Sequence, residues 1–251
     1  MREIDVSEIT QVVKDMCISA NYKLSADMQR ALDKAKNEEE SELGKKIFAQ
    51  LQENLEIAEN DQIPICQDTG MAVFFFKIGQ DVHFVGGDLS EAINEGVRQG
   101  YTEGYLRKSV VGDPLIRKNT GDNTPAVVHY DIVPGDKVVI TCAPKGFGSE
   151  NMSRVFMLKP ADGEEGVKAA VVQAVKDAGP NACPPMVVGV GIGGNMEQCA
   201  LAAKKALLVP IGSENPDPKL AALEKELFDR INATGIGPSG MGGRTTAIKV
   251  V

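Results

Sequence analysis

The sequence predicts a mixed α/β (α+β) fold in which helices pack on a mixed β-sheet. Three observations support this prediction. Apolar residues recur with helical spacing through the opening segment, compact apolar runs follow from residue 72, and glycine-rich loops separate strands from helices in the second half. We interpret residues 1–251 as one domain, with a helical N-terminal layer over 1–60 and a sheet-bearing part over 61–251.

The opening helices are predicted from apolar periodicity. Residues 6–22 carry a stripe that includes Val13 and Cys17, which is typical of a helix with one buried face. Ser25 is placed to cap a second helix that ends near residue 35. The stretch 41–58 repeats the helical period and predicts a third helix.

Strands are predicted where apolar runs are bounded by turn residues. The run 72–78 is interpreted as a buried strand, and 82–85 as its partner across Gly79-Gln80-Asp81. A helix is then predicted from about residue 88 to Arg107. The remaining predicted elements are, in chain order, strand 126–132, strand 137–142, helix 162–178, strand 186–191, helix 196–208, helix 218–234 and strand 245–251.

Composition excludes several classes of function. The net charge of −8 and the absence of Trp argue against a nucleic-acid-binding surface, which needs basic groups and stacking platforms. No apolar run is long enough to cross a membrane, so we expect no membrane association. Five scattered cysteines do not form a disulfide framework, and they favour free or metal-bound thiols in a reducing cytoplasm.

Two cysteines lie in rigid polar or proline-rich surroundings. Cys66 lies in Pro64-Ile65-Cys66-Gln67-Asp68-Thr69-Gly70, where an amide, a carboxyl group and a turn-forming glycine follow the thiol. Cys183 precedes two prolines before a predicted strand. Such a pair suggests a metal cluster assembled by the fold, although packing is the usual role of a free cysteine. Cys17, Cys142 and Cys199 are interpreted as core residues.

Three further segments offer polar groups. The segment Lys145–Asn151 is either a carboxylate-binding loop or a tight strand-to-helix connection. Gly189–Gly194 satisfies the GxGxxG pattern, which permits a dinucleotide site or another anion at a helix N-terminus. Asn119–Pro125 predicts a pair of turns or the support of a site. Arg107 and Arg244 are candidate carboxylate clamps, with Arg107 at a helix end.

His83 and His129 are each predicted to lie on strands without a partner, and both are interpreted as structural. The chain has no GxSxG elbow, no HExxH pair and no paired carboxylates at short spacing, which leaves hydrolases of those kinds without support.

Five motifs in order resemble one family. The chain is similar from about Ile4 to its last residue to the alpha subunit, or N-terminal half, of the iron–sulfur hydro-lyases, class I fumarate hydratase and L-tartrate dehydratase. The motifs that carry the resemblance are Cys66-Gln67-Asp68-Thr69-Gly70, Asn119-Thr120-Gly121-Asp122-Asn123-Thr124-Pro125, Ala143-Pro144-Lys145-Gly146-Phe147-Gly148-Ser149-Glu150-Asn151, Gly191-Ile192-Gly193-Gly194 and Gly237-Pro238-Ser239-Gly240-Met241-Gly242-Gly243-Arg244-Thr245-Thr246.

The resemblance implies a [4Fe–4S] cluster and an activity. Cys66 and Cys183 match two of the three cluster ligands, and the third cysteine is expected beyond Val251, so the chain is interpreted as truncated at its C-terminal end. An open iron would polarise the hydroxyl group of a small dicarboxylate during reversible addition or removal of water. Fumarate and malate are the first expectation for the substrate, and tartrate is the next.

The resemblance also implies residue roles and a partner. Asp68 is the candidate acid or base, with capping of its own turn as the alternative. The implied substrate-binding residues are Gln67, Asp68, Arg107, Lys145, Gly148, Ser149, Glu150 and Asn151. A beta subunit is expected to complete the site, and without it and the C-terminal segment we expect no activity. Two alternatives are a dinucleotide-binding oxidoreductase domain and a cluster-free binding or assembly domain. An oligomer is expected for the hydro-lyase.

Overall fold

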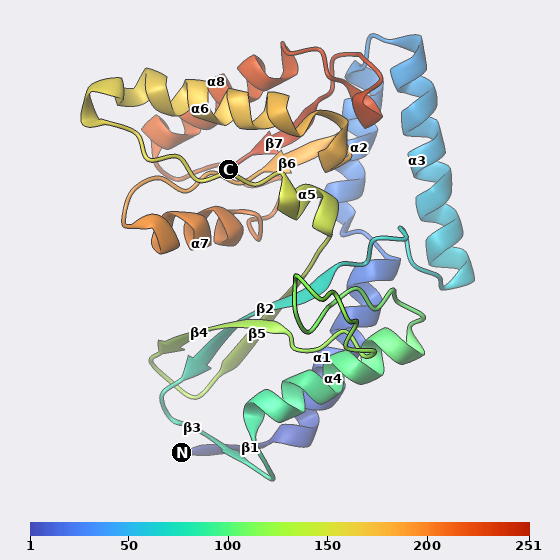
Figure 1. Cartoon of the computed structure of the whole chain (residues 1–251), viewed down its shortest axis with the longest axis vertical. Coiled ribbons are helices and arrows are strands. Elements are labelled where there is room, and N and C mark those ends of the chain that lie inside the picture. Colours follow the sequence, from blue (N-terminus) through green and yellow to red (C-terminus); the bar gives the residue numbers. More distant parts are fainter. The chain divides into compact units, whose positions relative to one another are not determined.

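The computed structural model describes residues 1–251 and divides into two compact units. Unit 1 comprises residues 1–24 and 54–147, and unit 2 comprises residues 25–53 and 148–251. Helices dominate and the strands form small sheets, so the prediction of a mixed α/β fold is confirmed (Figure 1). None of the helices has the length and apolar character needed to cross a membrane.

Unit 1 is built around the apolar strand β2. Its elements are β1 (Arg2–Asp5), α1 (Val6–Tyr22), the end of α3 (Glu42–Asp61), β2 (Met71–Gly79), β3 (Val82–Val85), α4 (Leu89–Glu103), β4 (Val127–Val133) and β5 (Val138–Lys145). β2 pairs with β4 in parallel and with β5 antiparallel, which gives the sheet order β4-β2-β5. Alternate residues of β2, among them Phe74 and Phe76, enter the core with no exposed surface.

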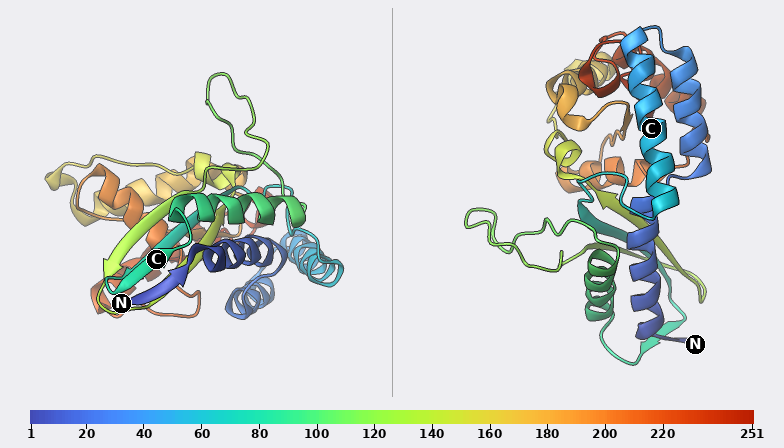
Figure 2. Two further views of the ribbon diagram at one scale, coloured as in Figure 1. Left: turned by 90° about the horizontal axis from the view of Figure 1, so that it is seen from below. Right: turned by 90° about the vertical axis from the view of Figure 1, so that its right-hand side faces the viewer.

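The helices α1 and α4 lie against each other and share this core (Figure 2). Their close approach requires glycine on α4, because an added Cβ at Gly96 would lie 2.6 Å from the carbonyl oxygen of Thr10. The Thr10 hydroxyl also donates to the carbonyl oxygen of Ala92, 2.9 Å away. Asp5 and Asp88 cap the two helices through backbone N–H groups of the first turn.

The prediction that the strand 82–85 pairs with β2 is wrong. β3 pairs in parallel with β1, the N-terminal strand Arg2–Asp5, which the sequence analysis did not predict. The polar segment Arg2–Asp5 has only one buried residue, Ile4, so it lacks the apolar alternation by which strands are recognised. With β4 and β5 on its two sides, β2 has no edge left for β3.

Unit 2 packs helices on a two-stranded parallel sheet of β6 (Met186–Val188) and β7 (Ala247–Val250). Its helices are α2 (Ala26–Glu38), the start of α3, α5 (Phe147–Asn151, from its second residue), α6 (Gly163–Ala178), α7 (Met196–Ala206) and α8 (Pro218–Asn232), with 3₁₀ turns at Pro160–Asp162, Gly179–Ala182 and Pro238–Gly240. The core combines Val175, Leu227 and Ile231 with the strands. The buried ammonium group of Lys168 on α6 pairs with Glu226 on α8 at 2.7 Å.

The tight α1–α4 packing predicts the effect of a small change. Gly96→Ala is expected to lower the free energy of unfolding by about 1–3 kcal/mol, because the clash with a backbone carbonyl outweighs the better helix propensity of alanine. Gly112→Ala is the matched control, since the nearest atom to an added Cβ there is 3.9 Å away. Urea unfolding followed by circular dichroism measures both, and equal stability of the two variants would contradict the packing argument.

Candidate functional site

The turn that carries Cys66 lies between α3 and β2 in unit 1. Cys66 and Gln67 are exposed, Asp68 is half-buried, and Thr69 is buried. The Asp68 N–H lies 3.4 Å from the Cys66 sulfur, which therefore accepts a hydrogen bond within the turn. Gly70 ends the turn at φ +65°, and an added Cβ there would lie 2.2 Å from the carbonyl oxygen of Lys145. Only glycine permits this approach of the turn to the end of β5.

The Asp68 carboxylate is held by the same strand end. Its Oδ2 accepts a hydrogen bond of 2.8 Å from the backbone N–H of Phe147. An added Cβ at Gly146 would lie 3.1 Å from this oxygen, so a glycine there leaves room for the carboxylate. The carboxylate therefore joins the turn to the segment that follows β5, rather than only capping its own turn. Gln67, Asp68 and Lys145 are brought together in this way.

Arg107 joins this group through Thr69. The Thr69 hydroxyl accepts from the Arg107 N–H at 2.9 Å and donates to the Arg107 carbonyl oxygen at 3.2 Å. The Arg107 side chain is exposed. The predicted position of Arg107 at a helix end is wrong, because α4 ends at Glu103 and Tyr105 has a left-handed φ of +51°. The backbones of Arg107 and Lys145 thus adjoin the turn that carries Gln67 and Asp68.

The turn is also held from the core. The hydroxyl of Tyr101, which has no exposed surface, donates to the Thr69 carbonyl oxygen at 3.0 Å. Burial raises the pKa of Tyr101, so its hydroxyl remains a donor at neutral pH. Neither Thr69 nor Tyr101 was identified as a supporting residue by sequence reasoning. Both contacts join positions far apart in the chain, and neither leaves a local pattern.

The loop Asn119–Pro125 supports the same region, one of the two roles considered for it. The Asp122 carboxylate pairs with Arg98 of α4 at 3.0 Å and accepts from the N–H and hydroxyl of Thr124. Burial alone would raise the pKa of Asp122, but these hydrogen bonds from Thr124 and Arg98 lower it to about 2. Asp122 is therefore ionised throughout the neutral range, and it fastens the loop to α4.

The other predicted substrate-binding residues, Gly148, Ser149, Glu150 and Asn151, lie on the short helix α5 of unit 2. Glu150 forms an ion pair with Lys204 of α7, with distances of 2.7 and 2.8 Å. An added Cβ at Gly148 would lie 3.0 Å from the Asn181 carbonyl oxygen, so α5 packs on the turn that precedes Cys183. Gly148 thus lies beside the turn that leads into the second cysteine, whereas Glu150 faces α7.

Cys183 is exposed and has a left-handed backbone, with φ +55°. Its N–H donates to the Pro180 carbonyl oxygen at 3.0 Å, and the next residue, Pro184, accepts from the Ser239 N–H at 2.8 Å. The glycine-rich segment Gly237–Gly243 therefore packs on the Cys183 turn. The two cysteines of the predicted cluster lie in different units, and their approach to one shared site stays a prediction.

Three cysteines have other surroundings. Cys17 and Cys142 lie in the core of unit 1, and hydrogen bonding to Cys17 and burial raise the pKa of the Cys142 thiol. The core interpretation of Cys199 is wrong, because its helix α7 has no buried residue and the thiol is half-exposed. Among all described residues, no group of three His, Cys, Asp or Glu side chains is arranged to hold a metal ion.

The GxGxxG segment owes at least two of its glycines to packing. An added Cβ at Gly189 would lie 2.3 Å from the Ala203 carbonyl oxygen, and one at Gly191 would lie 2.0 Å from that of Cys199. These glycines let the segment lie directly on α7. β6 has β7 as its partner in a two-stranded sheet. The extended parallel sheet that a dinucleotide fold uses is therefore not built around this segment.

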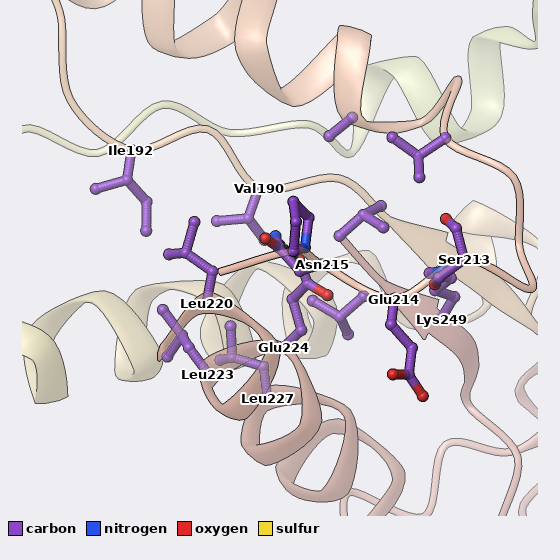
Figure 3. A pocket seen from close by; sticks show the side chains of 15 residues that line it. Val190, Ile192, Ser213, Glu214, Asn215, Leu220, Leu223, Glu224, Leu227 and Lys249 are labelled. Carbon is purple, nitrogen blue, oxygen red and sulfur yellow. Dashed lines mark hydrogen bonds between the residues drawn. The ribbon is translucent and has the colours of Figure 1, made fainter. Parts of the chain in front are cut away.

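A pocket of about 260 Å³ lies elsewhere in unit 2 (Figure 3). Leucine side chains of α8, including Leu220 and Leu223, line one side, and Ser213, Glu214 and Asn215 lie at another. None of the predicted site residues lines it. The pocket is largely apolar, and its one cation, Lys249, already donates to the carbonyl oxygens of Pro210 and Ile211, so we do not assign the carboxylate chemistry to it.

Glu39 anchors the segment Gly242-Gly243-Arg244-Thr245-Thr246 of unit 2. Its carboxylate is 2 % exposed and accepts four backbone N–H groups, those of Glu40, Ser41, Arg244 and Thr245, at 2.8–3.0 Å. Burial would raise the pKa of Glu39, but the N–H donors lower it from 4.5 to about 2. The exposed Arg244 guanidinium pairs with Glu40 at 3.2 Å.

Comparison with known proteins gives a consistent result. Residues 10–251 match the family described as fumarate hydratase (Fumerase). A Methanocaldococcus jannaschii protein, provisionally named L(+)-tartrate dehydratase subunit alpha, is 42% identical over 97% of this chain and 87% of its own length. The L(+)-tartrate dehydratase subunit alpha of Escherichia coli K12 is 34% identical over 98% of this chain and 82% of its own length.

The Glu39 anchor predicts a dependence of stability on pH. Because its folded pKa is below the ordinary value, the carboxylate stabilises unit 2 above pH 4.5, and this contribution is lost as the pH falls toward 2. Glu39→Gln is expected to lower the free energy of unfolding at pH 7 by about 2–3 kcal/mol and to flatten its decline at acid pH. Glu40→Gln is the control, since Glu40 is exposed. Denaturant titrations from pH 7 to 3 measure this, and parallel curves for wild type and Glu39→Gln would refute it.

Proposed function

This chain belongs to the fumarate hydratase (Fumerase) family, and we propose that it is the alpha subunit of a hydro-lyase that reversibly adds water to, or removes it from, a small dicarboxylate. The observation that carries the proposal is that the backbones of Lys145 and Arg107 are held beside the turn of unit 1 that carries Gln67 and Asp68. These groups combine positive charge, amide donors and a fixed carboxylate. That combination suits a substrate with carboxylate and hydroxyl groups.

The cationic side chains would bind and orient the substrate. Arg107 offers a planar fork of N–H donors that matches a carboxylate in a bidentate way. Lys145 at the end of β5 adds a second positive charge beside the turn. The whole chain carries a net charge of −8, so the attraction of a dianion has to come from such local cations. The Gln67 amide is exposed next to Cys66, where it can donate to a substrate oxygen.

Asp68 is the proposed acid or base of this chain. Removal of water breaks one C–O bond and one C–H bond, and the proton and hydroxide leave as water while a C=C bond forms. The hydrogen bond from the Phe147 N–H holds Asp68 Oδ2 in place, which gives the carboxyl group that would take or give the proton a defined position. Gly148, Ser149, Glu150 and Asn151 are proposed to contribute further polar contacts from α5.

A [4Fe–4S] cluster is the proposed cofactor. The donor chemistry fits, because Cys66 and Cys183 are free, exposed thiols on turns fixed by backbone hydrogen bonds. Cys66 and Cys183 would supply two of its thiolate ligands. When bound, such a cluster supplies a Lewis-acidic iron that polarises a substrate hydroxyl group.

We also propose a second subunit and two substrate candidates. The matched relatives carry the name subunit alpha, which supports a beta subunit as the partner that completes the site and hence a hetero-oligomer. Fumarate and malate follow from the family description, and L(+)-tartrate follows from the names of the relatives. The family assignment favours this reading over a dinucleotide-dependent oxidoreductase or a cluster-free binding domain.

The direct test is an assay of the assembled enzyme. The full chain, together with any segment that follows Val251 in the protein, is co-expressed with the second subunit, reconstituted anaerobically with iron and sulfide, and supplied with fumarate, malate or L(+)-tartrate. We expect turnover of at least one of them, and we expect Asp68→Asn to lower kcat by about 100-fold or more while cluster content is kept. Asp81→Asn, an exposed carboxyl group on the turn between β2 and β3, is the matched control. A fully loaded assembly that acts on none of the three would reject the proposal.

Cluster ligation is tested separately by serine variants. Cys66→Ser and Cys183→Ser are each expected to abolish stable uptake of the cluster, because a serine hydroxyl is a poor replacement for thiolate at iron. Cys199→Ser should keep wild-type uptake, since this half-exposed thiol hydrogen-bonds to the Met196 carbonyl oxygen of its own helix. Iron and sulfide analysis with visible absorption provides the measurement. Unchanged iron content in the Cys66 variant would remove that residue from the ligand set.

A further inference from the structure

Asn123 is a buried polar residue for which the proposed function has no role. It has no exposed surface, and its backbone is left-handed, with φ +64°. Asparagine tolerates this conformation better than most residues, but a buried polar side chain there still needs hydrogen-bond partners. The side chain of Asn123 has three such bonds, and all go to the backbone of segments that carry proposed site residues.

The three bonds connect two segments that are distant in the chain. The Asn123 Nδ2 donates to the Gly70 carbonyl oxygen at 3.1 Å, at the end of the Cys66 turn. Its Oδ1 accepts from the N–H groups of Ser109 at 2.7 Å and Val110 at 3.1 Å, directly after Arg107 and Lys108. One amide therefore satisfies a carbonyl of the turn and two N–H groups of the arginine segment.

The loop that carries Asn123 is itself held in place. On one side Asp122 pairs with Arg98 of α4. On the other side the N–H of Ala126 donates to the Asn94 side chain, also on α4, at 2.9 Å. Asn123 is therefore held between two contacts with one helix, so that it can act as a rigid link rather than follow the segments that it joins.

We propose that Asn123 is a positioning residue that sets the spacing between Asp68 and Arg107. Asp68 precedes Gly70 by two residues, and Arg107 precedes Ser109 by two. A displacement of the backbone at Gly70 therefore moves the Asp68 side chain, and one at Ser109 moves the Arg107 side chain. Thr69 bonds directly to Arg107, and Asn123 adds a second connection between the two segments by holding Gly70 on one side and Ser109 and Val110 on the other. The inference rests on the proposed function only for the identity of the groups that are positioned.

The amide chemistry of Asn123 provides a selective variant. Asn123→Asp keeps an oxygen that can accept from Ser109 and Val110, but it replaces the Nδ2 donor with a second oxygen that faces the Gly70 carbonyl. The new oxygen then repels the Gly70 carbonyl of the turn, while the N–H groups of Ser109 and Val110 stay hydrogen-bonded. Asn123→Ala removes all three bonds. The two variants therefore predict different patterns at the two segments.

The first measurement is hydrogen exchange of the folded chain at single-residue resolution. In Asn123→Asp, the amides of Arg107 and Phe147, which bond to Thr69 and Asp68 of the turn, are expected to exchange about tenfold faster, and those of Ser109 and Val110 to keep their protection. In Asn123→Ala all four should exchange faster. Amides of β2 report whether unit 1 remains folded.

The second measurement is the kinetics of the assembled enzyme. Asn123→Asp is expected to raise KM for the dicarboxylate about tenfold at unchanged iron content per chain, because Arg107 and Asp68 no longer engage the substrate together. A role limited to folding would instead lower the fraction of active enzyme, and with it the apparent kcat, at constant KM.

Two control variants separate the effect of the Asn123 hydrogen bonds from general effects of changing this loop. Asn119→Asp makes the same chemical change on an exposed side chain that bonds to Lys108 and Gly121, not to the turn. Ser109→Ala removes a buried hydroxyl that has no hydrogen-bond partner. Both should keep wild-type exchange at Phe147, and Ser109→Ala should also keep the wild-type KM.

The outcomes are distinct. Wild-type exchange at Arg107 and Phe147 in Asn123→Asp would overturn the positioning role of Asn123. Altered exchange with an unchanged KM would overturn it as well, because Asn123 would then have a purely structural role. If the wild-type assembly acts on none of the substrates, the proposed function fails, and the exchange pattern alone then decides whether Asn123 holds the turn.

Discussion

The approach of Gly70 to the carbonyl oxygen of Lys145 is the constraint on which the proposed site in unit 1 depends. The antiparallel register of β2 and β5 places Met71 opposite Lys145, so the turn before β2 must pass over the end of β5. A side chain at Gly70 would occupy the position of that carbonyl oxygen. With glycine there, Asp68 reaches the Phe147 N–H, and the turn stays close enough for Thr69 and Asn123 to bind the segment after α4.

Local patterns predicted most of the elements because those elements have local causes. The helix 6–22 and the strand 72–78 follow from apolar period and length, and the structure places both within one residue of the prediction. The pairing of β3 could not be predicted in the same way. Its partner β1 is short and polar and lies about 80 positions earlier in the chain, and strand order depends on which edges of β2 are already occupied.

The sequence could predict which residues belong to the candidate site, but not the hydrogen bonds that hold them in place. Polar residues around Cys66 and the family resemblance together indicated Gln67, Asp68 and Arg107. The supporting contacts of Thr69, Tyr101 and Asn123 join residues 13 to 53 positions apart, so no short sequence window contains both partners. Buried threonine, tyrosine and asparagine are also common as simple core polar groups, and only their hydrogen-bond partners distinguish them here.

The buried thiols Cys17 and Cys142 have a practical consequence for handling the protein. Cys17 is buried in the core of unit 1 and Cys142 packs against that core, whereas Cys66 and Cys183 are exposed and Cys199 is half-exposed. A thiol-modifying dye added to the iron-free chain should therefore label Cys66 and Cys183 first, Cys199 next, and Cys17 and Cys142 only when the interior opens. The number of dye molecules bound per chain therefore reports the fraction of a preparation that is folded, and it can be measured before any cofactor is added.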